Sequence, residues 1–129
     1  MTVRRRLLST VAELDALDER ESSRVEGCRP IGSVAPRERV RVAGILRSVT
    51  YPPVDDAPDL RAHLYDGTGE LAIVLRGRRE VPGIVPGRRL VAEGVVLDDD
   101  GPTLVDPAYE LRPSLAELEE IDQVAGRHR

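Results

Sequence analysis

Two runs of alternating apolar and polar residues flank a glycine-rich tetrapeptide, and they constrain the fold of this chain more than any other feature. The apolar members of each run share one parity: Leu60, Ala62 and Leu64 in the first run, and Leu71, Ile73 and Leu75 in the second. Successive side chains of a strand point to opposite faces, so each run is typical of a half-buried strand. The tetrapeptide DGTG at 66–69 predicts a tight hairpin turn between them, with Leu64 and Leu71 inside.

The same tetrapeptide raises the question of chemistry, because Asp, Thr and Gly also build catalytic, phosphate-binding and cation-binding loops. The chain has no second motif that would complete an aspartic protease pair, and it has no Lys. No helix pattern follows the loop, so the sequence does not predict the helix N-terminus that a phosphate-binding loop requires. We therefore interpret DGTG as a turn in which the Asp66 carboxylate accepts hydrogen bonds from backbone N–H groups two or three residues further on.

Three further strands and two short helices are predicted on either side of this hairpin. A glycine interrupts the first strand at Gly44 and marks a bulge or bend, and Pro107 assigns the last strand to an edge or a bulge. The three strands are expected at 38–50, 88–97 and 103–111. Amphipathic patterns with capping-box spacing predict a helix at 9–24 and another at 112–124.

The fold class expected from this order is all-β with flanking helices. A curled sheet of five strands usually closes partly into a barrel, because closure buries one face and protects the edges. The domain organisation follows from these elements. We expect an N-terminal arm with an amphipathic helix at 1–36, a barrel at 37–111, and a C-terminal helix and tail at 112–129.

Composition narrows the class of protein. Aromatic residues make up 2% of the chain, with no Phe and no Trp, so the core must be aliphatic. A single cysteine, Cys28, excludes an intrachain disulfide and favours an inert thiol in a reducing compartment. The basic start of the chain meets acidic residues before any long apolar run, so neither a signal peptide nor a membrane span is expected. We expect a cytoplasmic protein.

The charge of the chain is acidic overall but segregated. The net charge is -4, whereas non-specific nucleic-acid binders are usually basic. Residues 25–50 carry five Arg against two Glu, and residues 67–89 again carry five against two. Residues 90–111 carry six acidic residues and no Arg. A local positive field is therefore compatible with the sequence, although charge runs of this kind also occur as solvated faces.

The strands resemble the OB-fold nucleic-acid-binding family, and most closely its anticodon-binding and helicase-wedge members. The resemblance rests on RVRVAGILRSV (39–49), LRAHLYDGTGELAIVL (60–75), PGRRLVAEGVV (86–96) and DPAYEL (106–111), which occur in the family's order. It covers roughly residues 37–111 and leaves out the flanking helices. It implies a five-stranded, partly open Greek-key OB barrel.

The resemblance also implies that single-stranded or structured nucleic acid lies across the outer face of the second and third strands. No catalytic constellation stands out in the sequence, so we expect neither an enzyme nor a cofactor. The residues carried over to that role are Arg47, Tyr51, Arg61, His63, Tyr65, Arg76 and Arg78, and Ala72 and Val74 share the face. This chain departs from the family in offering few aromatic platforms. It also places three carboxylates, Asp98 to Asp100, in the loop between the fourth and fifth strands.

Alternatives remain for these residues and for the chain as a whole. The arginines of the face, together with Arg79, fit either phosphate contacts or a solvated rim, and His63 fits either a surface or a contact residue. The triple Asp fits a solvated turn better than a cation loop, and His63 and His128 lack zinc spacing. An alternative function is a protein-interaction or homo-oligomerisation barrel that binds partners through the terminal helices.

Overall fold

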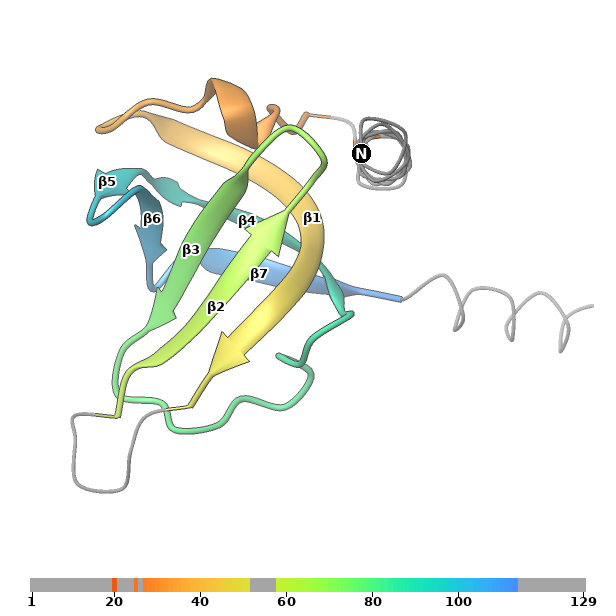
Figure 1. Ribbon diagram of the computed structural model, residues 1–129, viewed down its shortest axis with the longest axis vertical. Helices are drawn as coiled ribbons and strands as arrows, with labels where there is room; N and C mark the ends of the chain where they lie inside the picture. Colours follow the sequence, from red (N-terminus) through yellow and green to blue (C-terminus); the bar gives the residue numbers. More distant parts are fainter. Residues whose placement is uncertain (1–19, 21–24, 26, 52–57, 114–129) are drawn as a thin grey trace, which may run out of the picture.

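The computed structural model of the protein describes residues 20, 25, 27–51 and 58–113, and within these ranges the chain folds into one curled sheet of seven strands preceded by a short 3-10 turn (Figure 1). In chain order the elements are η1 (Ile31–Ser33), β1 (Arg39–Thr50), β2 (Leu60–Tyr65), β3 (Glu70–Leu75), β4 (Arg89–Val95), β5 (Leu97–Asp98), β6 (Pro102–Val105) and β7 (Ala108–Arg112). The expected all-β class is confirmed. The helices predicted at 9–24 and 112–124 fall almost wholly outside the described residues. Within the described residues, no helix is long and apolar enough to cross a membrane.

The expectation of five strands is wrong, because the described part of the chain contains seven. The predicted fifth strand is divided into β6 and β7 at Asp106, whose φ is 47°, and at Pro107, which has no N–H to donate. The remaining strand, β5, pairs with β6 across a turn at 99–101. Asp100 and Gly101 have φ values of 56° and 114° there, a geometry that aspartate tolerates and glycine favours.

The sheet curls because its two ends are made of neighbouring stretches of chain. The strand order is β5-β6-β3-β2-β1-β4-β7, so the β5–β6 pair and β7 lie at opposite ends, although only two residues separate β6 from β7. β6 runs parallel to β3, and β7 runs antiparallel to β4. The long strand β1 crosses the whole arrangement, pairing with β4 through residues 39–45 and with β2 through residues 45–50 (Figure 1). The result is a barrel-like fold.

Strand β1 approaches β2 closely at Gly44 and carries a bulge three residues later. A Cβ at Gly44 would lie 2.5 Å from the carbonyl oxygen of Tyr65, so a larger residue would push β1 and β2 apart. Leu46 pairs with Leu64 but Ser48 pairs with His63, which leaves Arg47 as the extra residue of a bulge. The bulge resets the alternation, and both Arg47 and Ser48 are therefore exposed.

The core is aliphatic, as the composition predicts. The side chains of Leu46, Leu60, Leu64, Leu71, Leu90 and Leu104 are at most 1% exposed. Leu64 lies opposite Leu71 in the β2–β3 hairpin, so the register predicted from the alternation is confirmed. Three residues outside the strands complete the core. They are Ile31 of η1 and Ile84 of the β3–β4 connection, each 2% exposed, and Val96 between β4 and β5, which is 0% exposed.

The DGTG turn is held together by the side chain of Asp66, which is 6% exposed. Its Oδ1 accepts hydrogen bonds from Thr68 N at 2.9 Å, Thr68 Oγ1 at 2.6 Å and Gly69 N at 3.2 Å. Its Oδ2 accepts a bond from Ile31 N at 2.9 Å, and Thr68 Oγ1 accepts one from Gly32 N at 3.0 Å. The interpretation of DGTG as a turn is confirmed. The same carboxylate also fastens η1 to the hairpin.

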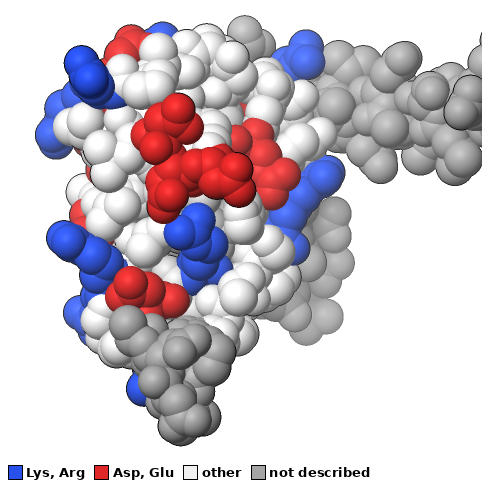
Figure 2. Space-filling view, turned by 60° about the vertical axis from the view of Figure 1, so that its left-hand side comes forward, with Lys and Arg blue, Asp and Glu red and all other residues white. Residues whose placement is uncertain are grey.

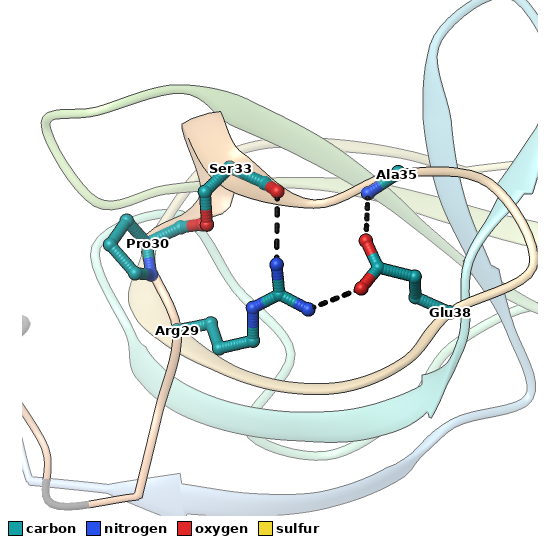
Figure 3. A network of polar contacts seen from close by, with 5 residues as sticks. All are labelled: Arg29, Pro30, Ser33, Ala35 and Glu38. Carbon is teal, nitrogen blue, oxygen red and sulfur yellow. Dashed lines mark hydrogen bonds and ion pairs between the residues drawn. The ribbon is translucent and has the colours of Figure 1, made fainter.

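A second polar network fixes the segment between η1 and β1 (Figure 3). Arg29 Nη1 donates to Glu38 Oε2 at 2.6 Å, and Arg29 Nη2 donates to the carbonyl oxygen of Ser33 at 3.1 Å. Glu38 Oε1 accepts a bond from Ala35 N at 2.9 Å. The hydrogen bond from Arg29 lowers the pKa of Glu38 below its ordinary value of 4.5.

The break between β6 and β7 is stabilised by Asp106. Its backbone N donates to the carbonyl oxygen of Val74 at 2.7 Å. Its carboxylate accepts bonds from Arg76 N at 2.8 Å and from Arg76 Nε at 2.7 Å. The backbone hydrogen bond from Arg76, followed by that from its side chain, lowers the pKa of Asp106 below its ordinary value of 3.8.

Removing the Asp66 carboxylate is predicted to destabilise the whole domain. In Asp66→Ala the backbone N–H groups of Ile31, Thr68 and Gly69 lose their acceptor. We expect the free energy of unfolding to fall by about 3 kcal/mol, because donors left unsatisfied in a partly buried site are costly. Chemical denaturation with urea measures this change.

Asp98→Ala provides the matched control, because it removes the same group from an exposed glycine turn. Asp98 accepts one bond of 3.3 Å, from Gly101 N, so we expect a loss of less than about 1 kcal/mol. Equal losses in the two variants would contradict the role assigned to Asp66.

Acidification is predicted to weaken the junction at Asp106. Because the folded pKa lies below the ordinary value of 3.8, the stabilisation is fully present above that value and is lost as the pH falls through the folded pKa. Asp106→Asn removes the titration while tolerating the positive φ. Urea unfolding at pH 5 and pH 3 should show a smaller acid-induced loss in Asp106→Asn than in the wild type, and equal losses would refute the prediction.

Candidate nucleic-acid interface

The outer face of β1, β2 and β3 carries most of the residues that the sequence assigns to nucleic-acid contact. The burial of β2 alternates strictly, with Leu60, Ala62 and Leu64 inside. Arg61, His63 and Tyr65 therefore lie outside and are half-buried. In the register, Arg61 is opposite Thr50 and Val74, and His63 is opposite Ser48 and Ala72.

The bulge in β1 brings Arg47 onto Tyr65. The guanidinium carbon of Arg47 lies 3.5 Å from the centroid of the Tyr65 ring, within the range of a cation–π contact. Both residues were named from the sequence, but as separate contacts. In the folded protein they form one stacked unit of a positive charge and an aromatic ring, which we call the Arg47–Tyr65 stack.

His63 forms a second pair on the same face. Its Nδ1 lies 3.0 Å from Ser48 Oγ, at hydrogen-bond distance. Ser48 is a residue that the sequence reasoning missed, because a regular strand would give it the inward parity of Leu46. The available signal was the change of phase in the apolar pattern between Leu46 and Val49, which the bulge explains.

Two of the predicted phosphate-contacting arginines are paired with carboxylates of the same chain. Arg61 Nη2 lies 3.6 Å from Asp99 Oδ2 in the β5–β6 turn, and Arg76 Nε lies 2.7 Å from Asp106 Oδ2. Figure 2, in which the side bearing β5 and β6 comes forward, shows a band of acidic side chains with arginines beside it. The acidic stretch 90–111 is thus folded against the basic stretches, and much of the local positive field expected from the sequence is compensated.

The other predicted residues lie around this centre. Tyr51 directly follows β1 and is 50% exposed. Arg78 is exposed in the β3–β4 connection, and its charge contributes to the lowered pKa of Asp106. Ala72 and Val74 do face outward, but each is only 7% exposed. They therefore offer little contact area to a ligand on this face.

Among the described residues, the fold does not place the other candidate residues from the sequence in a metal-binding or reactive arrangement. Within residues 27–51 and 58–113, no group of three or more His, Cys, Asp or Glu side chains is placed to hold a metal ion. Burial raises the pKa of the Cys28 thiol, which disfavours the reactive thiolate. His128 lies outside the described residues.

Comparison with known proteins adds no family to this picture. None of the protein-family models matches the chain, and none of the curated proteins is similar to it. Interpretation of the site therefore depends on its own geometry, at whose centre lie the Arg47–Tyr65 stack and the neighbouring pair of His63 and Ser48.

Proposed function

We propose that this protein is a non-catalytic OB-fold module that binds single-stranded nucleic acid across the outer face of β1, β2 and β3. The observation that carries the proposal is the Arg47–Tyr65 stack, with its 3.5 Å separation between guanidinium and ring centroid. An aromatic ring and a guanidinium plane are the groups on which unpaired bases stack. His63, one row further along β2, supplies a second flat ring.

The arrangement of strands supports the OB-fold part of the proposal. A long bent first strand pairs with both β2 and β4, and β6 and β7 together close the sheet against β3 and β4. In OB-folds the second and third strands provide the binding face, and adjoining loops border it. Here the turn at 99–101 reaches that face through the contact between Asp99 and Arg61.

The chemistry of the face favours stacking over phosphate contacts. Stacking of a base on an aromatic side chain contributes about 1–3 kcal/mol. Arg61 and Arg76 are already paired with Asp99 and Asp106, so they contribute less to phosphate binding than free arginines would. We therefore expect modest affinity with a shallow dependence on salt concentration.

Substitutions in the Arg47–Tyr65 stack test this proposal. We expect Tyr65→Ala to weaken binding of a labelled single-stranded DNA or RNA about tenfold, corresponding to the loss of about one stacked base. Arg47→Ala should weaken binding and reduce the slope of log affinity against log salt by about 0.7, the value for one lost phosphate contact on a single strand. Fluorescence anisotropy at several salt concentrations measures both effects.

Arg39→Ala is the matched control, because Arg39 is also an exposed arginine of β1 but lies at its other end, beside Glu93. We expect its affinity and salt slope to equal those of the wild type. Unchanged binding in both Tyr65→Ala and Arg47→Ala would remove the proposed site. Thermal melting of each variant verifies that the fold is retained.

A second candidate function, protein interaction, is favoured by a different observation. Val95 and Leu97 are each 46% exposed, and they flank Val96, which is 0% exposed. The alternation of side chains along an extended chain places both on the same outer side, where they form a small apolar surface next to Arg39.

Light scattering tests this candidate in its homo-oligomeric form. If the surface joins two copies, the wild type should have twice the mass of one chain, and Val95→Ser combined with Leu97→Ser should reduce the mass to that of one chain. A wild type with the mass of one chain would argue against self-association.

A further inference from the structure

The arginines of the outer face differ in the groups that their side chains contact. Arg47 lies with its guanidinium against the Tyr65 ring. Arg76 is tied to Asp106 by bonds from both its backbone and its side chain, at 2.8 and 2.7 Å, and it belongs to the β6–β7 junction. Within the described part of the chain, Arg61 is held only by an ion pair of 3.6 Å with Asp99.

The ion pair between Arg61 and Asp99 crosses the outer side of β3. In the sheet order β6 and β3 lie between β5 and β2, and Val74 on β3 is the residue opposite Arg61. The side chains of Arg61 and Asp99 are 40% and 72% exposed. An ion pair this exposed contributes at most about 1 kcal/mol to stability. This contribution to stability is too small to account for the position of the Asp99 carboxylate beside Arg61.

A carboxylate at this position affects single strands and duplexes differently. A single strand can stack its bases on Tyr65 and Arg47, and this part of its affinity does not depend on Arg61. A duplex keeps its bases paired, so a small basic face binds it through phosphates, and duplex DNA carries about one charge per 1.7 Å. Asp99 pairs with Arg61 and so withholds its charge from phosphate, which weakens duplex binding more than single-strand binding.

We propose that Asp99 is a specificity-determining residue of this face, which excludes duplex nucleic acid by pairing with Arg61. This inference rests on the proposed function and adds to it the source of its selectivity. It assigns the acidic β5–β6 turn a role in choosing the ligand, since an unfavourable charge placed against the wrong partner is a source of specificity.

The test compares the full-length wild type with Asp99→Asn by fluorescence anisotropy at low salt. The probes are a short mixed-sequence strand and the same strand annealed to its complement, each prepared as DNA and as RNA. We expect Asp99→Asn to raise duplex affinity about fivefold and single-strand affinity less than about twofold, since electrostatic contacts supply nearly all of the duplex term. The preference for single strands should fall accordingly.

Two control variants separate the contact from the change in net charge. Glu110→Gln removes the same charge from β7, which β1 and β4 separate from β2 in the sheet, and its affinities should equal those of the wild type. In Arg61→Ala combined with Asp99→Asn the duplex gain should disappear relative to Arg61→Ala alone, because there is no arginine to release.

The outcomes distinguish this inference from the function on which it rests. Single-strand binding that depends on Tyr65, without a duplex gain in Asp99→Asn, would overturn the role of Asp99 and leave the proposed function standing. An equal gain for both probes, or a duplex gain that persists without Arg61, would also overturn it. Absence of binding to every probe by the wild type and by Asp99→Asn would overturn both.

Discussion

The carboxylate of Asp66 is the interaction on which the rest of the arrangement depends. It is almost fully buried and accepts four hydrogen bonds, three from its own turn and one from Ile31 N. A buried carboxylate is stable only when such donors surround it, so the turn and η1 hold each other in place. The turn fixes the register of the β2–β3 hairpin, and that register turns Tyr65, the residue before Asp66, toward the outer face.

Local parts of this fold could be predicted from the sequence, and long-range parts could not. The alternation around DGTG identified the hairpin and its register, and the motif itself indicated the hydrogen bonds that Asp66 accepts from residues two and three positions on. The partner at Ile31 lies 35 residues away, and no local pattern specifies it. The division of the last strand was only signalled by Pro107. Its position depends on the left-handed conformation of Asp106, which Val74 and Arg76 stabilise across the sheet.

The same contrast between local and long-range features applies to the candidate site. The parity of β2 was enough to place Arg61, His63 and Tyr65 together, because alternation is a local property. The contact between Arg47 and Tyr65 depends on a bulge, and the bulge is defined only by the pairing of β1 with β2. The carboxylates that face the arginines were counted from the sequence as a separate acidic stretch. They reach the basic face because β6 lies beside β3, which composition does not encode.

The acidic net charge of -4 becomes easier to understand once the two kinds of binding energy are separated. Long-range attraction depends on net charge and on unpaired arginines. In this protein the net charge is negative, and Arg61 and Arg76 are paired with Asp99 and Asp106. Stacking depends on the placement of a ring and a guanidinium plane, which the bulge at Arg47 and the Asp66 turn both fix at the C-terminal end of β2. A face that binds nucleic acid in the proposed way is governed by local geometry, and its selectivity is expected to increase as its electrostatic attraction falls.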